Sequence, residues 1–196
     1  MKDVLQLKVS LDESNPLIWR RILIHKDASF FELHHTIQIA IGWQNYHMFE
    51  FILEGYRIGH IFEDEELDGL GGDSLLDSRN IRLKEVISSN GVEVKYVYDF
   101  GDYWEHTIVV EEMLDLDPGC TYPVCIAGEM ACPPEDCGGI HAHYENLEIL
   151  SDKKHPEYKG TKSWMPRGYD PAKFNLEKVN QQLNKLDVYI RKWLRS

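Results

Sequence analysis

The chain has 196 residues, and its 33 Asp and Glu outnumber its 21 Lys and Arg to give a formal net charge of −12. This acidic balance argues against a surface that neutralises phosphates, so nucleic acid is disfavoured as a direct partner. No apolar stretch is long enough to cross a bilayer, and the N-terminus lacks the apolar core of a secretory signal. We therefore expect a cytoplasmic protein without membrane contact, folded as one domain over residues 1–196.

The first part of the chain predicts two strands and a helix. Apolar and polar residues alternate from Val4 to Leu11, which is typical of a half-buried strand, and a second apolar run extends from Ile18 to Ile24. Ser29 and Glu32 have the spacing of a helix capping box, and Gly42 supplies a stop signal. We expect an antiparallel strand pair followed by a helix that covers the sheet.

The middle of the chain predicts a hairpin, an acidic loop and a short helix. Strands around 48–53 and 56–61 flank a tight turn at Glu54-Gly55. The acidic run from Glu63 to Asp77 is interleaved with glycines, which is typical of a solvated loop. A short helix is expected from Arg82 to Ile87.

A second hairpin is the strongest strand signal in the sequence. Its two strands, Val92–Phe100 and Tyr103–Glu112, both alternate apolar and polar positions. The alternation places every second residue of the first strand, through Phe100, on the buried face. It also predicts that His106 points into the core and that Glu105 points outward.

The last part of the chain predicts a long loop followed by helices. Residues 115–139 hold prolines, glycines and all four cysteines, which is typical of a long ordered loop. A helix is expected from Ala142 to Leu150, and Asp170-Pro171 has the pattern of a helix start. An apolar stripe then predicts one C-terminal helix over about 171–195, packed on the domain.

Together these elements predict an α+β fold. We expect a mainly antiparallel sheet of about five or six strands with helices packed on it. The long loop, rich in Cys, Pro and Gly, is expected to lie beside the last hairpin.

Several segments carry a family resemblance. One is Tyr98-Asp99-Phe100-Gly101-Asp102-Tyr103-Trp104-Glu105-His106, and another runs from Cys125 to Gly139. Together with Pro16-Leu17-Ile18-Trp19-Arg20-Arg21 they resemble the plasmid pRiA4b ORF-3-like family, also labelled the passenger TnpR family of an insertion element. The resemblance extends over nearly the whole chain and implies a relationship to plasmid or mobile-element proteins. It brings no activity with it.

The cysteines suggest a candidate zinc site. The resemblance includes Cys125, Cys132 and Cys137, and thiolate and imidazole are ligands that Zn²⁺ prefers. With His106 from the neighbouring hairpin they form the candidate metal set. A local alternative draws on three further residues, Cys120, His141 and His143. Free thiols and a disulfide are the alternatives to bound zinc, and free thiols are favoured in a cytoplasmic protein.

A second candidate functional motif consists of Asp99, Asp102, Trp104 and Glu105, beside His106. Carboxylates and an imidazole in one hairpin are able to hold a divalent ion or to supply an acid and a base. Strand alternation, however, separates Glu105 from His106, and a turn favours a short polar residue at Asp102. A structural role is therefore favoured over catalysis.

The sequence favours a non-catalytic interaction module. It contains no glycine-rich phosphate cradle, no nucleophile elbow and no His-Glu-x-x-His pair. The loop from Cys120 to His143 and the adjoining acidic surface are expected to contact an unknown protein partner. The alternative is a metal-dependent hydrolase or nuclease that uses the carboxylates of the second motif, His106 and the cysteines. A DNA-binding regulator is third because of the charge balance.

Overall fold

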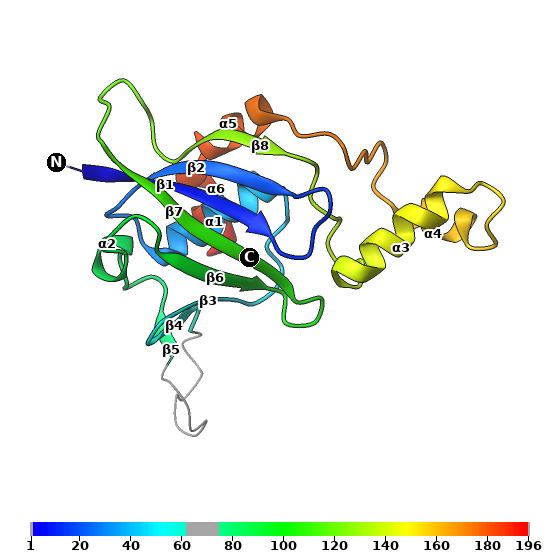
Figure 1. Ribbon diagram of the computed structural model, residues 1–196, viewed down its shortest axis with the longest axis horizontal. Helices are drawn as coiled ribbons and strands as arrows, with labels where there is room; N and C mark the ends of the chain where they lie inside the picture. The colour runs from blue at the N-terminus through cyan, green and yellow to red at the C-terminus, as the bar shows by residue number, and fades with distance from the viewer. Residues whose placement is uncertain (1, 62–74, 196) are drawn as a thin grey trace.

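The protein is described by a computed structural model over residues 2–61 and 75–195 (Figure 1). Most of the predicted acidic loop, up to residue 74, lies outside the described residues. The described strands are β1 (Lys2–Leu11), β2 (Trp19–His25), β3 (Phe49–Leu53), β4 (Tyr56–Gly59), β5 (Leu75–Asp77), β6 (Glu93–Tyr98), β7 (Trp104–Asp115) and β8 (Val124–Glu129). The described helices are α1 (Phe30–Ile41), α2 (Leu83–Val86), α3 (Gly139–Ser151), α4 (Tyr158–Trp164), α5 (Leu176–Leu183) and α6 (Leu186–Trp193).

The predicted α+β fold is confirmed, and its sheet is larger than expected. Eight described strands form one sheet in the order β5-β4-β3-β6-β7-β1-β2-β8, and only the β4–β5 pair is parallel. The expectation of five or six strands missed β5 and β8. Part of the long ordered loop expected over 115–139 is a strand instead, because β8 lies within it and pairs with β2.

The second hairpin forms as predicted. Tyr96 lies opposite His106, and His106 is fully buried. Glu105 faces outward, where it bonds to Lys95 at 2.7 Å. Phe100 is 51% exposed, contrary to the expected inward face, because β6 ends at Tyr98 and the chain then turns.

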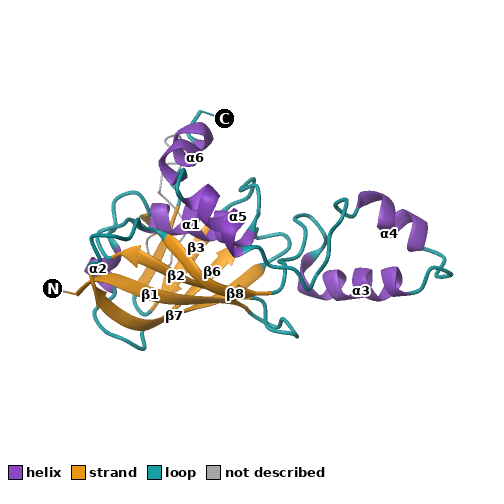
Figure 2. Cartoon of the chain, turned by 90° about the horizontal axis from the view of Figure 1, so that it is seen from above, coloured by secondary structure: helices purple, strands orange, loops and turns teal. Residues whose placement is uncertain are grey.

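Helix α1 lies against the sheet and is the most buried helix (Figure 2). Its capping box is present: Ser29 Oγ accepts from Glu32 N at 3.1 Å, and Ser29 N donates to Glu32 Oε2 at 2.8 Å. Gly42 ends the helix with φ 99°, a left-handed conformation that favours glycine. All residues of α1 except Glu32 are buried, so this helix forms one side of the core.

The C-terminal region differs from the predicted single helix over 171–195. Asp170 accepts from Ala172 N in a turn at 3.1 Å, and the helical stretch begins only after Asn175, whose Oδ1 accepts from Lys178 N at 2.9 Å. The stretch is then broken near Asn184 into α5 and α6. An apolar stripe of constant spacing does not reveal this break, because both halves keep facing the body.

Helices α3 and α4 extend away from the sheet as a projecting arm (Figures 1 and 2). We call residues 139–164 the arm. Helix α3 was predicted within one to three residues of its bounds, whereas α4 was not expected. No described helix is long and apolar enough to cross a membrane.

Strand β8 forms one edge of the sheet and is covered by α5. The side chain of Asn180 pairs with the backbone of Cys125: its Oδ1 accepts from Cys125 N at 2.9 Å and its Nδ2 donates to Cys125 O at 2.8 Å. These two bonds satisfy backbone groups that an edge strand would otherwise leave open. Asn180 therefore ties the C-terminal helices to the sheet.

Candidate functional site

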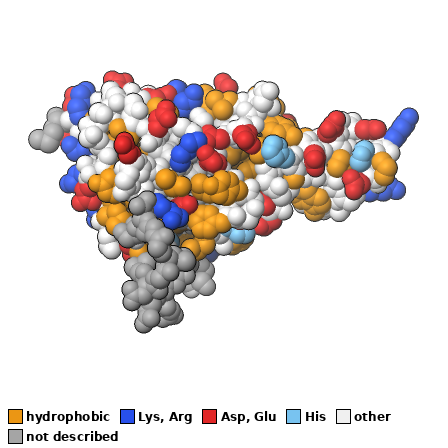
Figure 3. Space-filling model, turned by 60° about the horizontal axis from the view of Figure 1, so that its bottom comes forward, with side chains coloured by type: hydrophobic (Ala, Val, Ile, Leu, Met, Phe, Trp, Pro, Cys, Tyr) orange, Lys and Arg blue, Asp and Glu red, His pale blue; other side chains and the backbone are white. Residues whose placement is uncertain are grey.

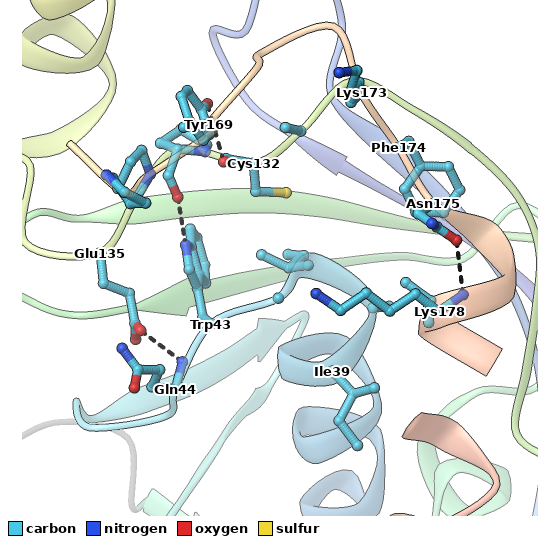
Figure 4. Close-up of a pocket in the computed structure, with 18 of the residues that line it drawn as sticks. Ile39, Trp43, Gln44, Cys132, Glu135, Tyr169, Lys173, Phe174, Asn175 and Lys178 are labelled. Carbon is cyan, nitrogen blue, oxygen red and sulfur yellow. Dashed lines mark hydrogen bonds between the residues drawn. The ribbon is translucent and has the colours of Figure 1, made fainter. Parts of the chain in front are cut away.

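Three loops that are far apart in sequence meet at one end of the sheet. They are residues 42–47 after α1, the 99–103 turn of the second hairpin, and residues 131–139 after β8. Trp43 joins the first loop to the third, because its Nε1 donates to Pro133 O at 2.8 Å (Figure 4). We call this meeting of loops the loop junction.

The turn of the hairpin is clamped to the third loop. Asp102 Oδ2 accepts from Gly138 N at 3.1 Å. A Cβ atom at Gly139 would lie 2.7 Å from Asp102 O, and the φ of Gly139 is 83°. Glycine is therefore needed there for both the backbone conformation and the close approach.

Glu135 links the third loop to the first loop and to the end of β6. One of its oxygens accepts from Tyr98 Oη and the other from Gln44 N, each at 2.6 Å (Figure 4 draws the bond to Gln44). Burial, together with the Glu135 carboxylate, raises the pKa of Tyr98 far above its ordinary value. The phenol thus stays protonated and donates to the carboxylate.

One histidine and two aspartates converge at the loop junction. His47 Nε2 lies 2.9 Å from Asp136 Oδ1 and 3.6 Å from Asp99 Oδ2. Among the described residues, these three are the group of His, Cys, Asp and Glu whose ligand atoms all lie within 4.8 Å of one another. Imidazole and carboxylate are both metal ligands, so this trio is the best placed of the described groups to hold a cation.

A cleft of about 530 Å³ opens beside the loop junction (Figure 4). It lies between the end of α1, the 131–136 loop and the chain from Trp164 to Gln182. Trp43 and Tyr169 supply aromatic surface, and Tyr169 Oη donates to Cys132 O at 3.2 Å. Lys178 extends its side chain into the cleft in Figure 4.

A buried cation lies beneath the cleft. Arg20 is 2% exposed, and its guanidinium donates to Ala40 O and Glu129 O, both at 2.8 Å. It also contacts Cys132 Sγ at 3.5 Å and lies 4.0 Å from the centre of the Phe174 ring. Within the described part of the chain it forms no ion pair with a carboxylate. The floor of the cleft therefore carries a positive charge that is stabilised by backbone carbonyl groups and by the face of the Phe174 ring.

A second cavity adjoins the cleft along the C-terminal helices. This cavity, of about 380 Å³, shares Trp43, Gln44 and Gln182 with the first and is also lined by Lys185 and Lys192. Lys173 and Lys178 line the first cavity, and we call the two adjoining cavities together the groove.

The candidate zinc ligands do not meet as a group. Cys132 contacts Arg20, Cys125 Sγ lies 3.4 Å from Ala127 O, and Cys137 Sγ lies 3.9 Å from Gly139 O. No three of Cys125, Cys132, Cys137 and His106 have ligand atoms within 4.8 Å of one another in the described structure. His106 and Cys132 do line one small internal void. All four cysteines are free thiols, and Cys120 is the one that is not buried.

Burial keeps these groups uncharged. It raises the pKa of the Cys125 and Cys132 thiols, against the lowering effect of Arg20, and raises the pKa of Cys137 to about 12. Burial also lowers the pKa of His106 to about 4, and its Nδ1 donates to Trp104 O at 3.0 Å. His106 is therefore a neutral side chain of the core.

The residues of the second candidate motif point to different neighbours. Asp99 Oδ1 accepts from Gly101 N at 2.9 Å, as a turn residue does. Glu105 pairs with Lys95, and Trp104 is 1% exposed in the core. Of this motif, only Asp99 belongs to the possible metal-binding group, which it forms with His47 and Asp136.

Sequence reasoning did not single out His47, Glu135 or Asp136. The first is separated from the other two by nearly ninety positions, and Glu135-Asp136 follows two prolines in a loop without periodicity. The nearest signal was the density of polar residues in the loop that contains Cys132 and Cys137. It indicated the right segment and the wrong side chains.

Comparison with known proteins gives one consistent result. The model of the plasmid pRiA4b ORF-3-like protein family matches residues 3–178. "Uncharacterized protein y4hQ" of Sinorhizobium fredii (strain NBRC 101917 / NGR234) is 34% identical over 195 residues, which cover 98% of this chain and 95% of the relative. The crystal structure of a protein of unknown function, MM3350 from Methanosarcina mazei Go1, is 34% identical with a TM-score of 0.79, and the match covers 90% of this chain and 97% of that one.

Proposed function

The chain belongs to the family of plasmid pRiA4b ORF-3-like proteins, and from its geometry we propose that it is a non-catalytic protein-interaction module. Its groove binds an extended acidic segment of a partner protein. The observation that carries this proposal is the set of four lysines that line the groove, Lys173, Lys178, Lys185 and Lys192. From the family's name we extend to this chain a relationship to plasmid proteins, and we propose that it acts in the cytoplasm.

Charge supports an acidic occupant. Residues 153–196 hold 11 of the 21 Lys and Arg of the chain but only 4 of its 33 Asp and Glu. The groove lies along this basic part of an otherwise acidic protein. Lys173 has an ion-pair partner in Asp170 at 3.3 Å, whereas Lys178 forms no ion pair within the described residues. A carboxylate in the groove would supply a partner for Lys178.

The groove also offers apolar surface for an anchor. Trp164 is 44% exposed and Val188 is 54% exposed, and both line the groove. Aromatic and aliphatic surface beside charged groups is typical of the centre of a protein interface. An acidic segment that also carries apolar side chains would use both features.

A protein segment fits the groove better than a nucleic acid. Glu135 and Asp136 lie on the wall that faces the lysines, and the first 152 residues carry 29 of the 33 acids. A continuous phosphate backbone would meet these carboxylates, whereas a short peptide confines its charges to the lysine wall. The proposed contact surface is therefore the groove rather than the whole loop from residue 120 to 143. Of that loop, residues 131–136 form one wall of the groove.

The carboxylates of the second hairpin already have hydrogen-bond or ion-pair partners, and this supports a non-catalytic role. Asp102 accepts from a backbone N–H, and Glu105 pairs with Lys95 on the far side of the strand from His106. An acid and a base for general catalysis must both reach one reacting group. These side chains are instead arranged to hold the turn.

The test is fluorescence anisotropy with defined probes. A labelled peptide of Asp, Glu and Phe is compared with the same peptide carrying Lys in place of the acids, and with a thymidine oligonucleotide of equal charge. We expect the acidic peptide to bind and its affinity to fall with salt. The double variant Lys178→Glu/Lys185→Glu should weaken binding at least about tenfold.

The matched control is Lys153→Glu/Lys154→Glu in the arm. It makes the same change in net charge at exposed positions outside the groove, and Lys and Arg side chains gather at the far end of the arm in Figure 3. The proposal is contradicted if this control weakens binding as much as the groove variant does. Tighter binding of the oligonucleotide than of the acidic peptide would also overturn it.

A further inference from the structure

We propose that His47, Asp99 and Asp136 form a binding site for one divalent transition-metal ion of the Mn²⁺, Fe²⁺ or Zn²⁺ class. This site is distinct from the cysteine set and does not depend on the groove binding a partner. It comprises one imidazole nitrogen and two carboxylate oxygens, each from a different loop of the loop junction.

The positions of the three ligand atoms suit one shared ion. Nε2 of His47 lies 2.9 Å from Asp136 Oδ1 and 3.6 Å from Asp99 Oδ2. Ligands bonded to one ion at about 2.0–2.2 Å are separated by roughly 3 Å at the angles of tetrahedral or octahedral coordination. Both separations from His47 are close to this value, and the Asp99 and Asp136 oxygens lie within 4.8 Å of each other, so side-chain movements can bring all three to one ion.

Asp99 supplies an independent indication of a ligand. Its side chain is only 10% exposed, and Oδ1 is bonded to Gly101 N. Oδ2 accepts no hydrogen bond from any described residue and faces the His47 ring. His47 Nε2 approaches Oδ2 to 3.6 Å, so Oδ2 keeps a lone pair that is available to a cation placed between the two side chains.

The charge around the trio also favours a cation. Glu135 and Asp102 are adjacent at the loop junction, and both accept hydrogen bonds from neutral donors. No Lys or Arg in the described ranges pairs with these two acids or with Asp99 and Asp136. The loop junction thus holds two further carboxylates besides those of Asp99 and Asp136, and a divalent ion would offset the repulsion between the four.

The ligand types select the class of metal. Carboxylates alone favour Mg²⁺, Ca²⁺ and Mn²⁺, whereas imidazole favours Zn²⁺, Fe²⁺ and their neighbours. One nitrogen and two oxygens therefore indicate an ion that accepts both. Three protein ligands leave coordination positions of the ion open. Because Asp136 also lines the cleft, the ion would lie beside the cleft.

The experiment uses the full chain, freed of metal with a chelator and without an affinity tag. Mn²⁺ binding is followed by electron paramagnetic resonance and Zn²⁺ binding by calorimetry. We expect one equivalent of ion to bind, and both His47→Ala and Asp136→Asn to weaken binding at least about tenfold. The Asp136 side chain is 67% exposed, so its variant is expected to fold.

Two variants serve as matched controls. His141→Ala removes an imidazole that is 90% exposed, and Asp152→Asn removes a carboxylate in the arm. Both should bind the ion as the unaltered chain does. The proposal is overturned if the unaltered chain binds neither ion more tightly than about 1 mM, or if the controls lose binding equally. The second result would mean scattered surface binding, and neither result would bear on the peptide test.

Discussion

Two regions of the molecule differ in how far their residues are buried. The first is the sheet together with α1, which we call the sheet region, and the second consists of the C-terminal helices α5 and α6. Eleven of the twelve residues of α1 are buried, whereas no residue of α6 is, although both helices lie on the same side of the sheet (Figure 2). The sheet region also buries polar side chains such as His34, which bonds to Tyr96 Oη at 2.8 Å. Stability is thus concentrated in the sheet region, and the C-terminal helices are left with exposed surface and with Lys178, Arg191 and Lys192 available for binding.

Among the single substitutions considered, replacing Phe51 with Ala should produce the largest loss of stability, and it tests where stability is concentrated. Phe51 is fully buried on β3, 4.8 Å from Tyr96 and 5.0 Å from Phe30 between ring centres. Removing a buried ring costs about 3–5 kcal/mol of unfolding free energy, through lost burial and the cavity left behind. Urea denaturation measures it, with Trp164→Ala in the arm as the comparison.

The two variants should differ clearly. Trp164 is 44% exposed, and its loss should cost less than about 1 kcal/mol. Equal losses would show that the arm contributes as much stability as the sheet region, and stability would then not be concentrated in the sheet region.

Acid should destabilise the protein through the buried histidines of the sheet region. Burial lowers the pKa of His35 and of His106 to about 4, so the folded protein holds both neutral. As the pH falls below about 6.5, the unfolded chain takes up protons first. Their stabilising contribution is complete above that value and is lost progressively down to pH 4, by about 1.4 kcal/mol per pKa unit for each group.

Denaturation at several pH values measures this slope. His106→Asn should flatten it, because the variant lacks one of the groups that titrate. A slope that His106→Asn does not alter would place the acid sensitivity elsewhere in the molecule.

A smaller loss than that of Phe51→Ala is expected at the contact that joins the two regions. Asn180→Ala removes both side-chain bonds to Cys125 and leaves the edge of β8 unpaired. We expect a loss of about 1–3 kcal/mol. Hydrogen exchange should show faster opening of β8 and α5, with the amides of β1 and β7 unchanged. Faster exchange throughout the sheet would mean that the C-terminal helices and the sheet region open together.

Periodicity and capping were sufficient to predict most of the fold. The alternation around His106 predicted both its burial and the outward direction of Glu105, because a strand has a strict period of two. Ser29, Glu32 and Gly42 predicted the bounds of α1, because capping depends on residues close in sequence. Strand β8 was missed because its pairing with β2 lies about a hundred residues away and its own segment has the composition of a loop.

The candidate site was decided by tertiary structure. His47, Asp99 and Asp136 belong to three loops, and nothing near each residue in sequence indicates the others. The groove depends on the break between α5 and α6 and on Arg20 lying beneath Phe174. The sequence by itself determined the family, the α+β fold and which faces are buried, since these follow from local patterns. Only the folded chain decided which charged groups meet, because that depends on contacts between distant loops.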